Sequence, residues 1–578
     1  MEAKDSRGAS AAKRYVIVGG VAGGATAAAR LRRLDGEAQI TLFERGEDIS
    51  FANCGLPYYV GDAIKEREQL LLMTPELFRT RFAVDVRTRC EVTGVDTIRQ
   101  QVHVRTADGA RYDEPYDALL LAPGAKPLRP PIPGIDSPRI LALRNVPDAA
   151  LLRGLADRYA GSGRAVIVGG GFIGVEMAEN LRERGLSVTL VEAAPHILAP
   201  FDADMAKLAE KELNENGVGL VLGDGVREFK ETEEGVRVLL GSGRELAADF
   251  VVLAIGVSAD TEFLQDSSIA LAQRGHILVN EYLETNIPGI YAVGDAAATH
   301  ERQTGRPGSL PLAGPANRQG RLAADNMAGR HHAYDGFIGT AILKVFSLTA
   351  AAVGKNERTL EREGLRYGED YRVVKLHPFS HVTYYPGAAA MTVKLIYAAK
   401  NPAGKILGAQ IVGGDGVKAR IDALAAAISL EADVVFLSGL ELSYAPPYGA
   451  AKDPVNMAGY MALNELDGLV RFLPAERLAA AKKNGVRILD VRTPGELQSA
   501  PMESDVQIPL DELRERCEEL DKNTVWAVLC KVGQRAYNAA RILAQKGYQV
   551  QVISGGYTSL VMEAFEASPE AAPPQPIL

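Results

Sequence analysis

Cysteine is scarce in this sequence. Four cysteines occur in 578 residues, and they are Cys54, Cys90, Cys517 and Cys530. So few cysteines exclude a disulfide scaffold, and no two of them have the spacing of metal ligands. We therefore expect no bound metal. Cys90 and Cys517 have ordinary neighbours, so we expect both of them to be structural.

Long apolar runs and an excess of positive charge are missing as well. No stretch approaches the roughly 18 apolar residues of a membrane helix, and residues 1–14 lack the apolar core of a signal peptide. The formal net charge of −9 disfavours general binding to nucleic acid or to an anionic membrane surface. Together with the scarcity of cysteine, these absences predict a cytoplasmic protein that acts on small molecules.

Two glycine-rich turns stand out among the features that are present. The first reads GGVAGG, contains Gly19, Gly23 and Gly24, and follows a short apolar strand; the next strand ends in Glu44. Glycines let the backbone approach a pyrophosphate, the following helix presents N–H groups, and the acid binds a ribose hydroxyl. The pattern predicts a dinucleotide site, although Val21 stands where the G-x-G-x-x-G motif has its middle glycine.

The second turn carries the full motif. Gly169, Gly171 and Gly174 lie in register between a strand and a helix, and the next strand ends in Glu192. Two such units in one chain, each with its terminal acid, predict two dinucleotide sites. Glu192 would repel the 2′-phosphate of NADPH, and the residues AAPHIL that follow contain no Lys or Arg, so the pattern favours NADH.

Further segments complete the pattern of a known family. Apolar strands end at Gly124 and Gly256, and IPGIYAVGDAAA brings Gly294 and Asp295 to a turn. With these motifs the sequence resembles the flavoprotein disulfide reductases over residues 14–460. The resemblance implies FAD at the first site, with Asp295 at the ribityl chain, and the nicotinamide nucleotide at the second. It also implies that the helix beginning near Ala313 directs its N-terminus at the flavin.

The length, at roughly 100–200 residues per domain, allows three or four domains. The resemblance implies an α/β fold with two Rossmann-like domains, an α/β dimerisation domain and a homodimer whose active sites are completed across the interface. The predicted division is an FAD-binding domain over 1–149 and 279–334, an NAD(P)H-binding domain over 150–278, a dimerisation domain over 335–468, a further α/β domain over 475–565 and a disordered tail over 566–578.

Cys54 lies in SFANCGLPYY, shortly after the first nucleotide-binding unit. No second cysteine is near enough for a local disulfide. A free cysteine is often a buried core residue, but Gly55 and the amide of Asn53 beside it leave room for a ligand. The motif resembles the coenzyme A-disulfide and persulfide reductases, which use one redox cysteine next to the flavin.

NADH oxidases and peroxidases are the alternative relatives, because their lone cysteine cycles through sulfenic acid. Those enzymes carry a histidine in the first glycine-rich loop, and Ala22 stands there in this sequence. We therefore predict slow reduction of peroxide. The reductase resemblance implies substrate contacts from Thr26, Arg33, Ser50, Asn53 and Lys452. It also implies catalytic tyrosines at Tyr444 and at either Tyr384 or Tyr385, between which the sequence does not decide.

Residues 475–565 resemble a rhodanese, or sulfurtransferase, domain. The segment has LDVR near its start, a C-x-x-G-x-R loop from Cys530 to Arg535 and a closing GGY, while SAPMESDVQIPL replaces the usual histidine-bearing segment. Loop N–H groups that converge on the Cys530 sulfur, with the charge of Arg535, would stabilise a thiolate or a persulfide. Phosphatases of this fold need a longer loop, so the six-residue loop favours sulfur.

Taken together, the motifs predict an FAD-dependent NADH:sulfur–sulfur bond reductase. Cys54 would act on coenzyme A persulfide, polysulfide or coenzyme A disulfide, and Cys530 would handle sulfane sulfur. The fusion favours persulfide, since a sulfurtransferase adds nothing to disulfide reduction. The alternatives are an NADH oxidase or peroxidase, a sulfurtransferase with flavin-supplied reductant, and a redox sensor.

Overall fold

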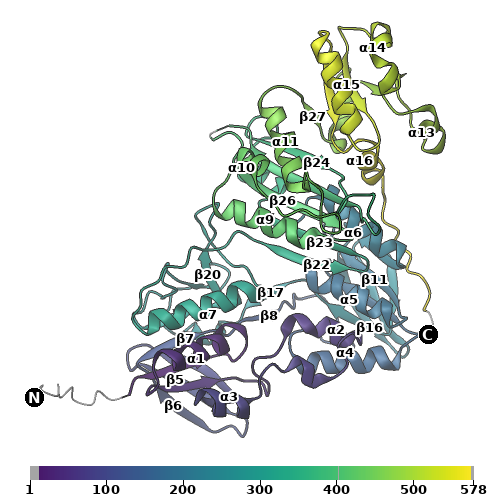
Figure 1. The fold of residues 1–578 in the computed structure, drawn as a ribbon. Coiled ribbons are helices and arrows are strands. Elements are labelled where there is room, and N and C mark those ends of the chain that lie inside the picture. The colour runs from purple at the N-terminus through teal and green to yellow at the C-terminus, as the bar shows by residue number, and fades with distance from the viewer. Residues whose placement is uncertain (1–11, 401, 575–578) are drawn as a thin grey trace, which may run out of the picture.

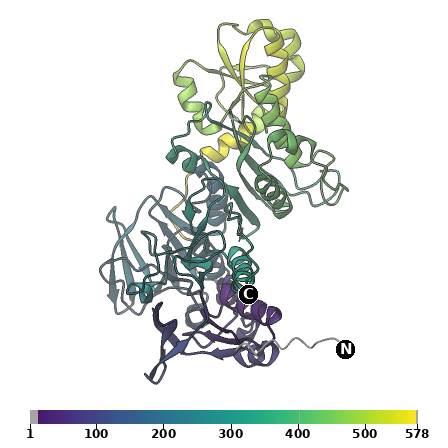
Figure 2. The same ribbon diagram turned by 90° about the vertical axis from the view of Figure 1, so that its left-hand side faces the viewer.

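The computed structural model describes residues 12–400 and 402–574, and four five-stranded sheets organise them (Figures 1 and 2). Two sheets belong to the two glycine-rich units, the third follows them, and the fourth lies near the C-terminus. In Figure 1 the rhodanese-like part stands at the top, beyond the third sheet. The predicted class, α/β with two Rossmann-like units and two further α/β domains, is confirmed.

The first sheet has the order β19-β7-β1-β2-β3, and its strands are parallel. Helices α1 (Ala22–Leu34) and α7 (Ala313–Met327) pack against each other beside it. Because β19 and α7 come from the second half of the chain, this unit is assembled from two separate stretches of sequence. The strands are β1 (Arg14–Val18), β2 (Gln39–Phe43), β3 (Asp85–Arg87), β7 (Ala118–Leu121) and β19 (Ile290–Ala292).

The second sheet has the order β12-β11-β10-β16-β9 and is also parallel. Strand β9 (Ile140–Leu141) lies before the predicted boundary at 149, so the chain enters this unit about ten residues earlier than expected; a two-residue strand leaves no recognisable pattern. The other elements are β10 (Arg164–Val168), β11 (Ser187–Glu192), β12 (Val218–Leu222), β16 (Phe250–Leu253), α4 (Val146–Arg158), α5 (Phe172–Glu183) and α6 (Ala203–Glu215).

The third sheet is antiparallel, with the order β22-β23-β26-β25-β24. Its strand β25 (Met391–Ala398) is buried along its whole length, since helices cover one side and the second unit covers the other. The remaining elements are β22 (Ala341–Val345), β23 (Leu348–Gly354), β24 (Tyr371–Leu376), β26 (Ile406–Gly413), α8 (Glu357–Arg362), α9 (Val417–Ser429), α10 (Val434–Gly439) and α11 (Pro454–Leu466).

The fourth sheet, order β27-β31-β30-β28-β29, is parallel. Its edge strand β27 (Phe472–Leu473) precedes the predicted start at 475, and its apolar residues join one buried cluster with those of the third sheet. The other elements are β28 (Arg487–Asp490), β29 (Val506–Gln507), β30 (Val525–Leu529), β31 (Gln549–Ile553), α12 (Leu478–Lys483), α13 (Pro494–Ser499), α14 (Leu513–Arg516), α15 (Gln534–Gln545) and α16 (Gly556–Glu563).

Smaller antiparallel sheets and two helices complete the described fold. The sheets are β4 (Cys90–Asp96), β5 (Gln101–Thr106) and β6 (Arg111–Pro115); β13 (Val226–Thr232), β14 (Gly235–Leu240) and β15 (Glu245–Ala248); and β8 (Ala125–Pro127) with β17 (Val257–Ala259). A mixed sheet contains β18 (Ile277–Leu278), β20 (Ala297–His300) and β21 (Pro307–Gly308), and the helices are α2 (Leu56–Val60) and α3 (Pro75–Phe82). In residues 12–400 and 402–574 no helix is long and apolar enough to cross a membrane. The cytoplasmic location stays a prediction.

Buried charges join the second unit to the part that contains the third sheet. Lys394 on β25 is only 1% exposed, and its ammonium lies 2.9 Å from Asp202, 2.8 Å from Asp204 and 2.6 Å from Glu357. Lys375 on β24 also pairs with Asp204. The two aspartates lie at the start of α6 in the second unit, so the cluster ties that unit to the third sheet. A buried lysine surrounded by carboxylates is stable only while these partners remain in place.

The C-terminal segment differs from the predicted disorder. Residues 566–574 lie along the edge strand β12, where Ser568 accepts a hydrogen bond from the Leu220 N–H at 2.8 Å and Ala572 donates one to Gly217 at 2.9 Å. At Gly219 a Cβ would come within 2.7 Å of this segment. The Pro-rich composition predicted disorder. Nothing in the sequence indicated the contact with β12, because the glycines that receive the segment lie about 350 residues earlier in the chain. Residues 575–578 of the predicted tail, and residues 1–11, lie outside the described residues.

A side chain at Gly219 is expected to displace the C-terminal segment. The variant Gly219→Val keeps a good strand former in β12 but fills the space that residues 569–571 occupy. Loss of the hydrogen bond from the Leu220 N–H would cost roughly 1.4 kcal/mol, and this cost corresponds to an exchange rate of that amide that is about tenfold higher. Hydrogen-exchange mass spectrometry measures it. Gly154→Ala, in open space on α4, is the control and should change nothing there.

Candidate functional site

The first glycine-rich turn has the shape of a dinucleotide cradle. Gly19 has a φ of +98°, and a Cβ there would lie 2.1 Å from the carbonyl oxygen of Ala122. A Cβ on Gly24 would lie 1.9 Å from the Gly19 oxygen, and one on Gly23 would lie 2.8 Å from Val293. Only glycine fits such close backbone approaches. The turn therefore holds the start of α1 close to the ends of β1 and β7.

The second turn repeats this geometry. Gly169 has a φ of +111°, and a Cβ on Gly174 would lie 1.9 Å from the Gly169 oxygen. Gly171, at the N-cap of α5, is exposed with open space beside it. That space leaves the helix N-terminus accessible to a phosphate.

Both terminal acids hold their glycine-rich turns. Glu44 accepts hydrogen bonds from the N–H of Gly20 at 2.9 Å and of Gly46 at 2.8 Å. Glu192 accepts equivalent bonds from Gly170 at 2.6 Å and Ala194 at 2.7 Å. Each carboxylate thus lies at the end of its second strand beside the turn, where a ribose hydroxyl would reach it.

The remaining predicted cofactor residues surround the first turn. Gly124 has a φ of +73° and lies between β7 and β8, while Gly294 has a φ of +75° and precedes Asp295. No described residue of 12–400 or 402–574 donates a hydrogen bond to the Asp295 carboxylate, and burial raises its pKa. Ala313 begins α7 without a side-chain cap. Unpartnered acceptors and helix N–H groups of this kind fit a polar ligand such as FAD.

Cys54 lies where the two dinucleotide units meet. Its side chain is exposed, in the short helix η1 (Asn53–Gly55) that leads into α2. Partial desolvation raises the pKa of the thiol, and the charges of Glu176 from the second unit and Asp295 from the first raise it further. Among the described residues the buried Oδ1 of Asn53 has no hydrogen-bond partner. An orphaned acceptor beside an exposed thiol indicates a ligand site.

The sequence missed a second titratable group near this thiol. Burial raises the pKa of Glu176 to about 7, although the Tyr58 hydroxyl, 3.4 Å away, favours its charged form. Burial raises the pKa of Tyr58 as well, and the Glu176 charge adds to this effect. A carboxyl group with a pKa near 7 can take up or release a proton at neutral pH. It lies on α5, 122 positions after Cys54, so no local motif pointed to it.

Two of the predicted substrate residues, Thr26 and Arg33, lie in α1. The Thr26 hydroxyl bonds to Asn317 at 2.6 Å, and the Arg33 guanidinium lies 5.4 Å from the centre of the Phe82 ring. Ser50 adopts a φ of +49°, which is unusual for a residue other than glycine. The structure thus brings Thr26 to α7 and leaves Arg33 stacked on α3.

The predicted tyrosines lie on the surface of the part that contains the third sheet. The hydroxyls of Tyr384 and Tyr444 are 2.9 Å apart, and this hydrogen bond raises the pKa of Tyr444. Tyr385 instead packs against His381, with the rings 5.6 Å apart. Lys452 is exposed nearby in sequence, eight residues after Tyr444. The structure therefore pairs Tyr384, and not Tyr385, with Tyr444, while the catalytic role of either tyrosine stays a prediction.

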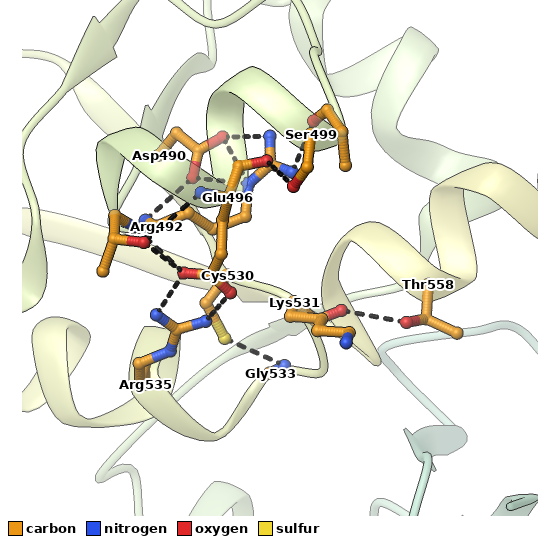
Figure 3. A network of polar contacts seen from close by, with 11 residues as sticks. Asp490, Arg492, Glu496, Ser499, Cys530, Lys531, Gly533, Arg535 and Thr558 are labelled. Carbon is orange, nitrogen blue, oxygen red and sulfur yellow. Dashed lines mark hydrogen bonds and ion pairs between the residues drawn. The ribbon is translucent and has the colours of Figure 1, made fainter.

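The Cys530 loop has the form of an anion-binding nest. Cys530 follows β30 and is 1% exposed, and its sulfur accepts a hydrogen bond from the Gly533 N–H at 3.1 Å. Gly533 has a φ of +96° and caps α15. Figure 3 shows this loop together with Arg535 and the buried pair of Asp490 and Arg492.

Arg535 faces a carboxylate as well as the Cys530 sulfur. Its guanidinium makes two hydrogen bonds to Glu496, at 2.7 and 2.6 Å, and this partner holds the pKa of Glu496 at about 2 (Figure 3). The sequence predicted the charge of Arg535 but gave no sign of the carboxylate that pairs with it. Glu496 belongs to the capping box of α13, a local signal for a helix start that gives no hint of Arg535.

Two dinucleotide units, an exposed cysteine between them and an antiparallel third sheet define a pyridine nucleotide-disulphide oxidoreductase. The sequence model of that family matches residues 13–320, its dimerisation domain matches 340–453, and the rhodanese-like domain matches 474–563. The chain belongs to the pyridine nucleotide-disulphide oxidoreductase family and carries a C-terminal rhodanese-like domain. Family membership implies FAD and a nicotinamide nucleotide as cofactors.

Particular relatives agree with the predicted resemblance. Coenzyme A disulfide reductase of Staphylococcus haemolyticus is 36% identical over 452 residues, which are 78% of this chain and 99% of the relative. The structure of reduced Bacillus anthracis CoADR-RHD is 44% identical, with a TM-score of 0.91, and covers 95% of this chain and 98% of that one. A NAD-dependent persulfide reductase from A. fulgidus is 35% identical, with a TM-score of 0.88, and covers 94% and 99%.

Proposed function

We propose that this protein is an NADH-dependent reductase of sulfur–sulfur bonds whose substrates are coenzyme A persulfide, polysulfide or coenzyme A disulfide. Its rhodanese-like domain would handle sulfane sulfur at Cys530. The position of Cys54 carries the proposal: one exposed thiol lies between the two dinucleotide units, beside the orphaned oxygen of Asn53. Similarity to a coenzyme A disulfide reductase and to a persulfide reductase supports the substrate class.

The described residues fit the cofactors of the family. The crowded Gly19–Gly24 turn and Glu44 would hold FAD, together with Gly124, Asp295 and the N-terminus of α7 at Ala313. The second turn, with Gly171 open, and Glu192 would hold the nicotinamide nucleotide. When bound, FAD supplies a two-electron carrier between NADH and the Cys54 sulfur.

The chemistry at Cys54 can be written for the persulfide. The thiolate attacks the coenzyme A sulfur, which forms a mixed disulfide and releases HS⁻. Two electrons and one proton then restore the Cys54 thiolate and release the coenzyme A thiol. The net reaction consumes one NADH and one persulfide and yields NAD⁺, the coenzyme A thiol and HS⁻. Glu176, with a pKa of about 7, is a proton carrier of suitable strength beside this thiol.

A second copy of the chain would complete this site. The matched dimerisation domain supports a homodimer. Exposed aromatic side chains on this part support it too, since Tyr384 is 73% and Tyr448 is 77% exposed. In such a dimer the Tyr384–Tyr444 pair would donate the proton to the departing coenzyme A thiolate in the other subunit, and Lys452 would bind the substrate there.

The oxidase and peroxidase alternative lacks its acid–base group. Ala22 occupies the first position of α1, where those enzymes carry a histidine. The cysteine would therefore cycle poorly through a sulfenic acid.

Steady-state NADH oxidation tests the proposal. We expect turnover with coenzyme A persulfide to exceed turnover with coenzyme A disulfide, and oxygen and peroxide to be poor acceptors. A peroxide rate equal to the persulfide rate would favour the peroxidase alternative. Sulfur transfer without NADH turnover would instead favour a sulfurtransferase.

NADH should be used at least about tenfold better than NADPH in kcat/KM, because the Glu192 carboxylate repels a 2′-phosphate. Glu192→Gln keeps one hydrogen bond to the turn but removes the charge, so the preference should fall while the fold remains. Kinetics with both nucleotides measure the effect. Equal use of the two by the unmodified protein would contradict the assignment.

A further inference from the structure

We propose that His377 is a positioning residue for the sulfurtransferase loop, so that the reductase part of the chain helps to build the Cys530 site. The inference rests on the sulfurtransferase part of the proposed function. His377 directly follows β24 in the third sheet, outside the rhodanese-like domain, and none of the sequence motifs includes it.

The Cys530 loop is held by the first turn of α16. Tyr557 donates its N–H to the Cys530 carbonyl at 2.8 Å, and Thr558 donates to the Lys531 carbonyl at 3.0 Å. A Cβ on Gly556 would lie 2.3 Å from the Cys530 carbonyl oxygen. The placement of α16 therefore decides where the first two residues of the loop lie.

The reductase part fixes α16 at two points. The His377 Nε2 atom lies 2.8 Å from the Ser559 hydroxyl, one turn into α16. On the other side of the pair Gly555 and Gly556, the Ser554 hydroxyl accepts a hydrogen bond from the Lys375 N–H at 2.9 Å. It also donates one to the Lys375 carbonyl at 3.2 Å. Residues 554–559 are thus attached at both ends to β24 and the residue that follows it.

The space around the glycine pair leaves little freedom for this segment. Gly555 has a φ of +73°, and a Cβ there would lie 2.1 Å from the Ser559 hydroxyl and 2.6 Å from His377 Nε2. The Tyr557 ring lies 4.5 Å from the Arg492 guanidinium, which is buried against Asp490. The His377–Ser559 contact is therefore continuous with the packing that holds the Cys530 loop.

His377 can keep this contact across the working pH range. Burial, together with the charge of Lys375, lowers its pKa to about 3, so the ring is neutral at pH 5 to 9. The charged groups that line the same small cavity are Lys375, Asp204 and Glu563, and Thr392 binds the other ring nitrogen at 2.9 Å. A change in reactivity between pH 5 and 9 therefore does not come from titration of His377.

Loss of the contact should disturb the sulfur site through the loop. A shifted α16 moves the Cys530 backbone relative to the Gly533 N–H, which donates to the sulfur at 3.1 Å. A thiolate that loses a hydrogen-bond donor has a higher pKa. The expected effect is therefore a Cys530 thiol that is deprotonated at higher pH.

The test is the pH dependence of Cys530 alkylation by iodoacetamide in the full chain with its cofactors, followed by mass spectrometry of the Cys530 peptide. His377→Leu and Ser559→Ala should shift the midpoint upward by about one unit, which is a tenfold lower rate below it. His377→Gln, whose amide can reach the position of Nε2, should restore the midpoint. Cys54 in the same samples is the internal control and should not change.

Sulfur transfer from thiosulfate, measured on the same variants, separates this inference from the proposed function. We expect kcat to fall about tenfold in His377→Leu with little change in KM, in line with a one-unit shift. Unchanged midpoints in His377→Leu and Ser559→Ala would overturn the inference, as would an equal loss in His377→Gln. If the unmodified chain transfers no sulfur but the midpoints shift as stated, the positioning role stands and the proposed sulfurtransferase function fails.

Discussion

Replacing Cys54 with serine is expected to abolish NADH-dependent reduction of coenzyme A persulfide. A hydroxyl in place of the thiol cannot form the mixed disulfide, so kcat should fall by about 10⁴-fold, the scale of losses when a nucleophile is removed. Transfer of sulfur from thiosulfate should continue at the unmodified rate, because Cys530 lies in a separate sheet with its own loop and partners. Both activities are measured on one preparation with FAD bound.

Cys530→Ser is the matched control and should give the reverse result. It should lose sulfur transfer and keep the reduction of preformed coenzyme A persulfide. Serine is similar in size, and its hydroxyl can still accept the Gly533 N–H, so the loop should keep its shape. If Cys530→Ser removes the reduction of every substrate, the two cysteines form one obligatory site and the proposed division of labour is wrong.

Replacing Lys394 with methionine is expected to destabilise the protein by about 3–5 kcal/mol at neutral pH, since it removes one of the two buried cations from a cluster of three carboxylates. Burial opposes ionisation of Asp204, but the charges of Lys375 and Lys394 outweigh it and hold the pKa of Asp204 below its ordinary value. A carboxyl group with a lowered pKa stabilises the fold above its unfolded pKa and loses that effect as the pH falls. The defect of Lys394→Met should therefore be largest near neutral pH and shrink in acid.

Urea unfolding at several pH values measures this prediction. Lys405→Met is the control, because Lys405 forms a partly exposed pair with Glu431 at 3.0 Å, and it should cost at most about 1 kcal/mol. Adding Asp204→Asn to Lys394→Met should recover part of the loss. Equal effects of the two single lysine variants would show that the buried cluster does not join the domains as inferred.

The sequence by itself determined the class of fold and singled out Cys54 and Cys530 as the candidate reactive cysteines. Each glycine-rich turn, its strand and its terminal acid lie within about 30 consecutive residues, so spacing alone predicts their geometry. The close approaches at Gly19 and Gly169 agree with that prediction. The nest at Cys530 is local as well, because its donor Gly533 lies three residues away. Interactions of this kind are encoded in short segments and can be read without a structure.

The tertiary structure decided which groups meet across the domains. Arg535 and Glu496 are 39 positions apart, Tyr384 and Tyr444 are 60, and His377 and Ser559 are 182. The C-terminal segment, which composition predicted to be disordered, is held by backbone groups of β12. Such contacts depend on how whole sheets pack, and side-chain pattern within a segment carries no information about a partner hundreds of residues away. For this reason the sequence could single out two candidate sulfurs but not the groups that surround them in the fold.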